Sequence, residues 1–204
     1  NLHSIYVDQW DWEKAIEKFD RNSGYLVDTV KTIYGALKAL GDFVNREYPQ
    51  IRNTLPEDIF FITTQELENM YPSLSPKERE NAITKEKKAV FIKNIGGMLE
   101  SGIRHDGRAP DYDDWELNGD IVLWNDVLDI AFEISSMGIR VDEESMESQL
   151  AIAGATNRKT LDFHEKILHK ELPYSIGGGI GQSRLCMYFL RKAHIGEVQV
   201  GIWP

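Results

Sequence analysis

The stretch YSIGGGIGQSRLCMYFLRKAH, residues 174–194, constrains the fold of this chain more than any other segment. Four glycines fall within five positions: Gly177, Gly178, Gly179 and Gly181. Glycine destabilises the interior of a helix or strand, so such a cluster is expected where the backbone passes close to another group. The amphipathic run that follows predicts a helix, and Arg184 stands in its first turn.

Two common phosphate-binding loops can be compared with this stretch. A P-loop requires a lysine and then a serine or threonine after its last glycine, whereas residues 182–184 read Gln-Ser-Arg. A dinucleotide-binding fingerprint requires a glycine where Arg184 stands, so that match is weak. The remaining interpretation is a glycine-paved floor beside an arginine that can bind a phosphate or stack on a base. A tight turn into a helix with a solvent-facing arginine fits the spacing equally well.

The charge balance limits the partners that this chain can bind. Against 23 Lys and Arg residues stand 33 Asp and Glu residues, for a net charge of −10. Binding to a nucleic-acid backbone depends mostly on clustered cations, so we expect no nucleic-acid partner. No apolar run approaches the length of a membrane span, so we expect no membrane partner either. The single cysteine, Cys186, cannot form an internal disulfide, which indicates a reducing, cytoplasmic location.

Hydrophobic periodicity predicts an α+β fold in which helices flank an antiparallel sheet. The predicted strands cover residues 3–8, 58–63, 88–95, 121–125, 131–141 and 197–203. The predicted helices cover residues 10–21, 25–47, 64–71, 75–87, 142–153 and 159–170, with a last one after the glycines. The strands mostly do not alternate with helices, which favours an antiparallel α+β arrangement. We expect residues 1–204 to form a single domain, since that length suffices for a real core.

A first cluster of polar side chains lies in YVDQWDWE, where Gln9 and Asp11 stand near the end of the first predicted strand. Because they are two positions apart, a strand would point both side chains to one face. A carboxylate beside an amide suits an ammonium group, such as the α-amine of an amino acid. An ordinary polar strand face is the alternative.

A second cluster lies on the paired strands at LNGDIVLW and AFEISSMGIRV, which carry Asp120 and Glu133. Two carboxylates that face one pocket repel each other unless a cation lies between them. Mg²⁺ held by one or two carboxylates and by substrate phosphates is a common arrangement. The alternative is that each carboxylate faces water. Arg140, seven residues beyond Glu133, stands where it could clamp a substrate carboxylate.

A third cluster is the segment RHDGRAPDYDDW, which lies within a polar stretch at residues 101–120 and contains Arg108 and Asp113. Loops of mixed charge are usually solvated, so this segment alone indicates little.

Taken together, these motifs resemble a known family. EISSMGIRV, followed later by IGGGIGQSRL, resembles the catalytic core of class II aspartyl- and asparaginyl-tRNA synthetases, with the glycine run as their third signature motif. The closer resemblance is to ammonia-dependent asparagine synthetases (aspartate–ammonia ligases), which share that fold. It extends through LHSIYVDQWDWE, RHDGRAPDYDDW, LNGDI and HIGEVQVGIWP, and so through essentially the whole chain.

The resemblance implies an ATP-dependent ligase that makes asparagine from aspartate and ammonia. The reaction would pass through β-aspartyl-AMP and release AMP and pyrophosphate, with ATP and Mg²⁺ as cofactors and a homodimer as the assembly. A non-catalytic synthetase-like module is an alternative. An aspartyl- or asparaginyl-tRNA synthetase core is a weaker one, because the net charge of −10 argues against it.

The resemblance also implies roles for individual residues. The amino-acid substrate would be bound by Gln9, Asp11, Ser135 and Arg140. The nucleotide would be bound by Asp120, Glu133, Ser136, Gly179, Gly181 and Arg184, and the metal by Asp120 and Glu133. The catalytic groups would be Arg108, Asp113 and Arg184, with Asp113 a candidate base for ammonium only through its place in the acidic segment. The substrate would lie turned end for end relative to the synthetases, so that Arg140 clamps the unreactive α-carboxylate.

The start of the sequence suggests a truncation. The chain opens with Asn1 rather than an initiator methionine, and members of the family are longer. By resemblance, we expect the missing N-terminal part of the domain to carry a dimer-forming helix and the phosphate-binding arginine of the second signature motif.

Overall fold

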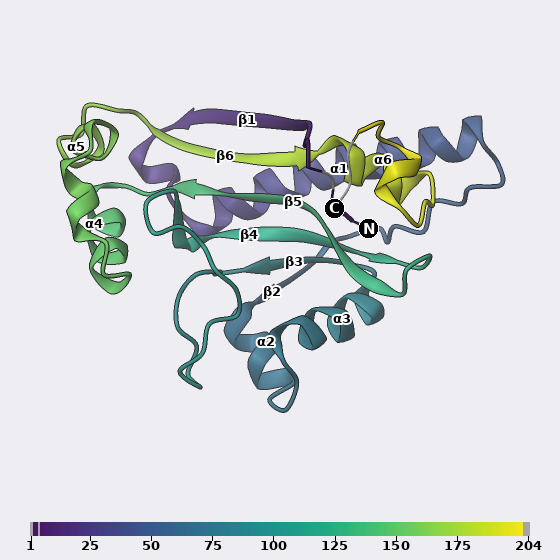
Figure 1. The fold of residues 1–204 in the computed structure, drawn as a ribbon, viewed down its shortest axis with the longest axis horizontal. Coiled ribbons are helices and arrows are strands. Elements are labelled where there is room, and N and C mark those ends of the chain that lie inside the picture. Colours follow the sequence, from purple (N-terminus) through teal and green to yellow (C-terminus); the bar gives the residue numbers. More distant parts are fainter. Residues whose placement is uncertain (1, 4, 202–204) are drawn as a thin grey trace.

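The computed structural model describes residues 2–3 and 5–201, and a six-stranded sheet forms its centre (Figure 1). The strands are β1 (Gln9–Ile16), β2 (Phe60–Thr63), β3 (Ala89–Lys93), β4 (Asp113–Asn125), β5 (Ile130–Arg140) and β6 (Tyr174–Gly181). Their order across the sheet is β1-β6-β5-β4-β3-β2. Neighbours pair antiparallel except β2 and β3, which are parallel. The sheet is therefore mixed rather than purely antiparallel, and the flanking helices complete the predicted α+β fold.

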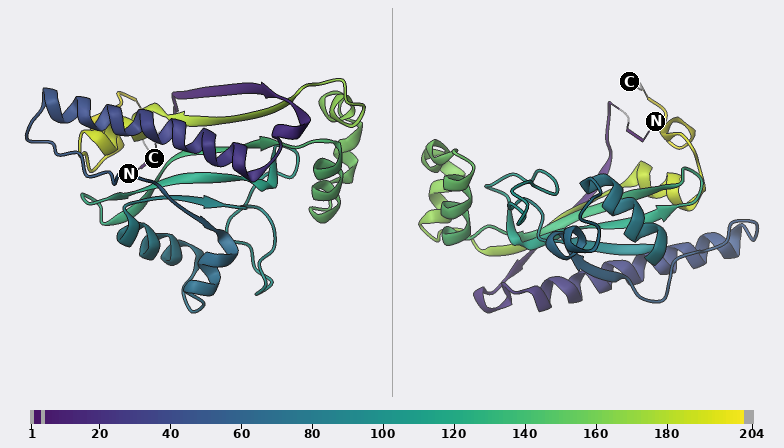
Figure 2. Two further views of the ribbon diagram at one scale, coloured as in Figure 1. Left: turned by 180° about the vertical axis from the view of Figure 1, so that it is seen from behind. Right: turned by 90° about the horizontal axis from the view of Figure 1, so that it is seen from below.

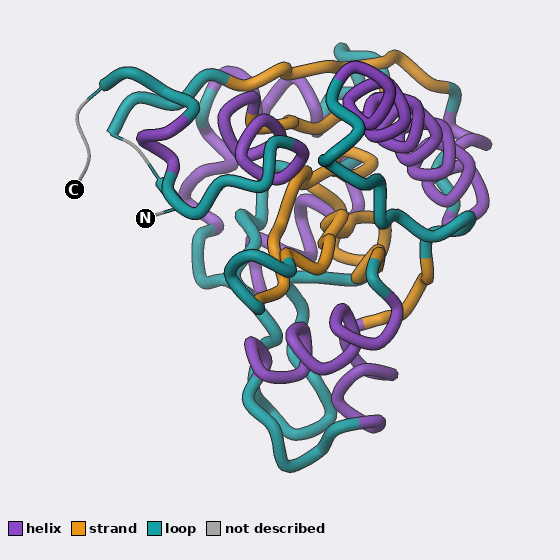
Figure 3. Tube along the Cα trace, turned by 90° about the vertical axis from the view of Figure 1, so that its right-hand side faces the viewer, coloured by secondary structure: helices purple, strands orange, loops and turns teal. Residues whose placement is uncertain are grey.

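Helices cover both faces of the sheet. They are α1 (Ser23–Glu47), α2 (Thr64–Met70), α3 (Pro76–Lys87), α4 (Glu143–Ile152), α5 (Asp162–Leu168) and α6 (Gln182–Phe189), with 3-10 helices at Lys18–Asp20, Thr156–Thr160 and Ile195–Glu197. The long α1 lies along one face, and α2 and α3 lie on the opposite face (Figure 2). From the side, the strands lie in the middle with helices around them (Figure 3). Within residues 2–3 and 5–201, no helix has both the length and the apolar character needed to cross a membrane.

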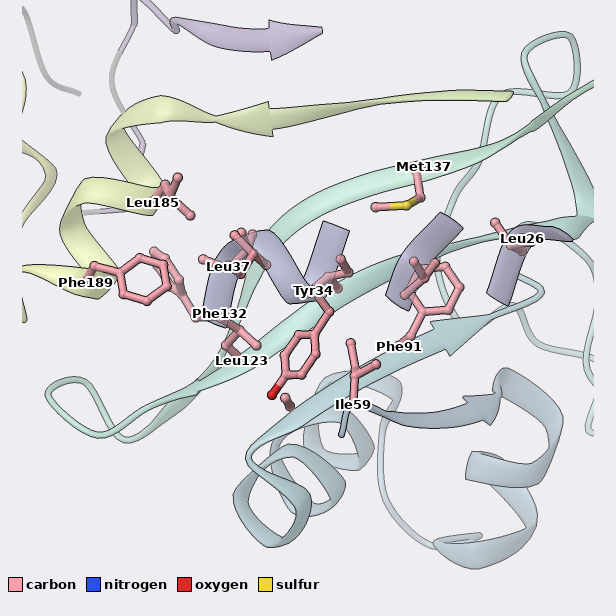
Figure 4. Close-up of a cluster of buried hydrophobic side chains, with 14 of the residues drawn as sticks. Leu26, Tyr34, Leu37, Ile59, Phe91, Leu123, Phe132, Met137, Leu185 and Phe189 are labelled. Carbon is pink, nitrogen blue, oxygen red and sulfur yellow. The ribbon is translucent and has the colours of Figure 1, made fainter. Parts of the chain in front are cut away.

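The larger hydrophobic core lies between α1 and the sheet (Figure 4). Leu26, Val30 and Leu37 are buried along one side of α1, at the helical spacing seen in the sequence. They pack with side chains of the sheet such as Phe91 and Met137, both fully buried. Burial of each large aliphatic side chain contributes about 1.5–3 kcal/mol, so this layer stabilises the sheet that carries the site.

A smaller core attaches α2 and α3 to the other face. Leu67 of α2 and Ile83 of α3 are fully buried with Val122 of β4. Val122 belongs to this core whereas its neighbour Ile121 belongs to the core under α1, because successive side chains of a strand point to opposite faces. The part of this face that α2 and α3 leave uncovered carries the candidate site.

The N-terminal segment differs from the sequence prediction. Residues 10–21, predicted as a helix, form most of β1 and the 3-10 helix Lys18–Asp20, and the described part of 3–8 forms no strand. The reason is long-range pairing, since every residue of β1 lies opposite one of β6 in antiparallel register. The alternation in WDWE fits a strand too, because Trp12 packs on the core while Glu13 points to the opposite face.

The glycine run also differs from the prediction, since it forms most of the strand β6 rather than a loop. β1 and β5 pair with it on either side, so hydrogen bonds between strands stabilise β6 despite the low strand propensity of glycine. The predicted closing strand at 197–203 is wrong for its described part, where a 3-10 helix ends and residues 198–201 form no strand. The polar stretch at 101–120 is a loop only up to Asp113, where β4 begins.

Candidate active site

A cavity of about 510 Å³ opens over β1, β6 and β5, a size typical of a small-molecule site. Ten of the predicted site residues line it: Gln9, Asp11, Arg108, Asp113, Glu133, Ser136, Arg140, Gly179, Gly181 and Arg184. Asp120 and Ser135 are not among its lining residues. The structure therefore brings together residues that lie up to 175 positions apart, from Gln9 to Arg184.

The β1 side of the cavity is built on glycine. Gln9 and Asp11 point to the same face, as their spacing predicts, and the Gln9 amide donates a hydrogen bond of 2.7 Å to the Asp11 carboxylate. They lie opposite Gly181 and Gly179 of β6. A Cβ atom at position 179 would lie 2.2 Å from the Gln9 amide nitrogen. Glycine is thus needed there so that the two polar side chains can lie over β6.

A β-bulge in β5 brings Glu133 and Ser136 to the side of the cavity opposite β1. Glu133 and Ser136 both line the cavity, although side chains three apart in a regular strand would point to opposite faces. The pairing of β4 with β5 shifts register here, since Ile121 lies opposite Ser135 and the next residue of β4 lies opposite Glu133. The bulge at Ile134 returns both to one face.

Ser135 has a different place from the predicted one. Its buried hydroxyl donates a hydrogen bond of 2.9 Å to the backbone carbonyl of Gly179, so it links β5 to β6. This contact supports the floor of the cavity from behind rather than from within it.

Arg108 reaches the cavity from the loop before β4. Its guanidinium donates hydrogen bonds to the Ser136 hydroxyl and, at 2.7 Å, to the Asp120 carboxylate. Its Nε is buried without a hydrogen-bond partner in the described residues, and an Asp113 oxygen lies 3.7 Å from it. A buried guanidinium with an unused donor suits an anionic ligand.

Arg140 is held by two carboxylates. Its Nη1 donates to Asp113, and its Nε and Nη2 donate to Glu13 at 3.1 and 2.8 Å. Its guanidinium also lies over the Tyr112 ring, 4.0 Å from the centroid. Sequence reasoning missed Glu13, although the signal was available, because Glu13 continues the alternate series that begins with Gln9 and Asp11.

Three carboxyl groups of the site have pKa values above the ordinary ones. Burial raises the pKa of Asp120, although Arg108 acts against it. Burial and the charge of Asp120 raise the pKa of Glu133, although Arg184 acts against them. Burial likewise raises the pKa of Asp113 against the pull of Arg140 and Arg108. Within the described part of the chain, no group of three or more His, Cys, Asp or Glu side chains is placed to hold a metal ion.

Arg184 lies in the first turn of α6, as predicted. Its Nη1 donates to the Glu133 carbonyl at 3.2 Å and lies 3.6 Å from the carboxylate of the same residue. Its Nη2 lies 3.0 Å from a ring nitrogen of His3, another lining residue that sequence reasoning missed. The guanidinium thus closes the α6 end of the cavity beside Glu133.

The sequence matches one family over its full length. Residues 1–204 match the family described as aspartate-ammonia ligase. The aspartate–ammonia ligase of Clostridium tetani is 65% identical over 204 residues, which make up 100% of this chain and 60% of that protein. The one from Ruminiclostridium cellulolyticum is 62% identical over 203 residues and is likewise covered over 60% of its length.

The chain belongs to the aspartate–ammonia ligase family. It spans about 60% of the length of the curated relatives that it matches. The resemblance drawn from the motifs is thus confirmed at the level of the family.

Solved structures show which fold this family member has. Aspartyl-tRNA synthetase from Entamoeba histolytica is similar with a TM-score of 0.68 at 15% identity, over 99% of this chain and 44% of that one. Asparaginyl-tRNA synthetase from the same organism, in complex with asparaginyl-adenylate, has a TM-score of 0.65 at 16% identity, over 97% and 47%. At such identities the likeness concerns the fold alone, which is that of a class II aminoacyl-tRNA synthetase catalytic core.

Proposed function

We propose that this chain carries the catalytic site of an enzyme that makes asparagine from aspartate, ammonia and ATP. The observation that carries the proposal is one cavity with the amide and carboxylate of Gln9 and Asp11 on one side and Arg184 beside Glu133 on the other. Such a cavity suits an amino acid at one end and a nucleotide at the other. Membership of the aspartate–ammonia ligase family supports this assignment.

The β1 and β5 strands would bind aspartate. Asp11, oriented by the Gln9 amide, would pair with the α-ammonium group, and Arg140 would pair with the α-carboxylate. This leaves the β-carboxylate directed toward the nucleotide. Ser135 would act through the Gly179 carbonyl rather than by touching substrate.

The α6 end would bind ATP. Arg184 would pair with the phosphates and stack on the base, over the floor formed by Gly179 and Gly181, and Ser136 would lie beside it. Asp120 and Glu133 suit Mg²⁺, because their mutual repulsion and raised pKa values would be relieved by a cation. Bound there, Mg²⁺ would neutralise phosphate charge.

The chemistry would then have two steps. An oxygen of the β-carboxylate attacks the α-phosphorus of ATP, and pyrophosphate leaves with the electron pair of the broken P–O bond. The nitrogen of ammonia attacks the β-carbonyl carbon, loses a proton, and displaces AMP. Arg108, with its buried unused Nε, would stabilise negative charge as it develops. Asp113 would accept the proton, since burial raises its pKa.

We also infer a cytoplasmic homodimer from the resemblance to the family and from the single cysteine.

The test is product identity. A full-length form would be incubated with ATP, Mg²⁺ and aspartate, together with either ammonium or tRNA. Free asparagine that forms only with ammonium would support the proposal. Aminoacylated tRNA would instead indicate a synthetase core, and ATP binding without either product would indicate a non-catalytic module.

A further inference from the structure

An ion pair between Glu13 and Arg140 crosses the sheet above an intervening strand. Glu13 belongs to β1 and Arg140 to β5, and β6 lies between these strands. The Glu13 carboxylate accepts hydrogen bonds from Nε and Nη2 of Arg140 and a further one from the Ser175 hydroxyl. The pair therefore joins three strands on the face that carries the cavity.

Gly177 makes this crossing sterically feasible. It is the residue of β6 that lies opposite Glu13 on one side and opposite Gly138 of β5 on the other. A Cβ atom at position 177 would lie 2.0 Å from the Glu13 carboxylate and 2.5 Å from Nη2 of Arg140. Any larger residue would have to displace the ion pair. The ion pair thus explains why glycine stands at position 177, without reference to a nucleotide.

The contacts of Arg140 leave two of its donors unused. A guanidinium carries five N–H donors in a rigid plane. Glu13 takes the edge formed by Nε and Nη2, Asp113 accepts from Nη1, and Tyr112 covers one face of the plane. One N–H of Nη1 and one N–H of Nη2 therefore remain unused. Because Arg140 lines the cavity, a substrate carboxylate can accept from these two donors.

We propose that Glu13 is a positioning residue that sets how Arg140 presents itself to the amino-acid substrate. This inference rests on the proposed function. Glu13 fixes the plane of the guanidinium and blocks the Nε–Nη2 edge with a negative charge that repels a substrate carboxylate. Without Glu13, that edge is open as well, so aspartate binds with less defined geometry and glutamate, longer by one methylene, gains room.

Kinetics of a full-length form with Glu13→Ala test the proposal. We expect the KM for aspartate to rise about tenfold or more, as for loss of a charged hydrogen bond, while kcat and the KM for ATP change less than about threefold. Discrimination against glutamate should fall by a similar factor. Glu13→Gln should lie in between, because its amide oxygen still accepts from Arg140. The control is Glu116→Ala, since Glu116 is exposed on β4, pairs with Asn94 and does not line the cavity.

Gly177→Ala supplies an independent arm. It should raise the KM for aspartate at least as much as Glu13→Ala does, because the added Cβ displaces both partners of the ion pair. An unchanged aspartate KM and unchanged discrimination in Glu13→Ala would overturn the proposal even if Gly177→Ala failed to fold. A parent protein that makes no asparagine would instead refute the proposed function.

Discussion

The three arginines of the cavity differ in how they are held. The side chains of Arg108 and Arg140 are 15% and 12% exposed and pair with the buried carboxylate of Asp113. Arg184 is 22% exposed, and its partners are the half-exposed side chain of Glu133 and the exposed ring of His3. The first two are therefore fixed parts of the site. Arg184 can exchange these partners for a ligand at little cost, which suits the nucleotide-binding role that we propose for it.

Arg184→Ala should lower ATP affinity about ten- to a hundredfold, which corresponds to the ~1.5–3 kcal/mol of a charged hydrogen bond. The fold should persist, because this side chain is partly exposed and lies at the cavity rather than in the hydrophobic core. Arg184→Lys should be nearly as damaging, since lysine neither binds in a bidentate way nor stacks. Calorimetric titration of ATP into a full-length form measures both variants, and unchanged affinity would contradict the role of this arginine.

Asp11→Asn should damage aspartate binding far more than ATP binding. The change removes the charge that would pair with the α-ammonium group but keeps the shape and the contact with Gln9. We expect a loss of roughly ten- to a hundredfold in aspartate affinity, from about 1.5–3 kcal/mol. Separate titrations with the two substrates give the comparison, and equal losses for both would count against an amino-acid site on β1.

The spacing of residues in the sequence predicts the shared face of some site residues but not of others. The two-residue step from Gln9 to Asp11 was sufficient to place them on one face, and the same step predicts Glu13. Glu133 and Arg140 are seven positions apart, a step that would put them on opposite faces of a regular strand. A single-residue bulge brings them to one face, and nothing in the local sequence announces it.

The glycines of β6 have different neighbours on the two faces of the sheet. Gly177 and Gly179 face the site, where added Cβ atoms would meet the tips of flexible side chains. Gly178 faces the core, where a Cβ would lie 2.6 Å from the Cβ of Met137 and 2.7 Å from the Ser136 carbonyl oxygen. The glycine run thus meets two requirements: it leaves room for polar side chains on the cavity face of the sheet and for close packing on the core face.

Gly178→Ala should therefore destabilise the fold, by about 1–3 kcal/mol as for overpacking of a core. The matched control is Gly35→Ala in the exposed part of α1, where a new Cβ meets nothing within 4 Å. That change should stabilise the protein by about 0.5–1 kcal/mol, because alanine favours a helix over glycine. Urea unfolding of both variants provides the measurement, and a neutral Gly178→Ala would refute the packing argument.

At the scale of elements, local signals predicted the helices better than the strands. The helix predicted at 75–87 is confirmed as α3, where Ser75 and Glu78 form a capping box and Pro76 lies in the first turn. The first strand, β1, was mistaken for a helix because its partner β6 lies more than 150 residues away in the sequence. Pairing with a strand that far away in the sequence produces no pattern in the residues of β1 itself.

The molecule as a whole is held partly by ion pairs between its distant segments. Glu143, at the start of α4, pairs with Lys18 after β1 at 3.3 Å and with Lys170 after α5 at 2.9 Å. Burial would raise the pKa of Glu143, but bonds from Lys170, its own backbone and Lys18 outweigh it and lower the pKa to about 2. The charged carboxylate thus ties together segments far apart in the chain.

Glu143→Gln should lower stability at neutral pH and have less effect in acid. A lowered folded-state pKa gives stabilisation that is present above the ordinary value of 4.5 and is lost as the pH falls toward 2. Urea unfolding of parent and variant across this range follows the difference, which should shrink with acid. The adjacent exposed Glu144→Gln is the control. A difference that does not depend on pH would exclude this linkage.

The proposed function requires that the AMP group of ATP is transferred to the β-carboxylate of aspartate, and oxygen tracing tests this step most directly. A full-length form would be given ATP, Mg²⁺, ammonium and aspartate labelled with ¹⁸O in both β-carboxylate oxygens. Mass spectrometry would then follow the label into the products. We predict one labelled oxygen in AMP and the other in the asparagine amide, because the C–O bond breaks in the second step. Label in inorganic phosphate, with ADP as the nucleotide product, would contradict the account.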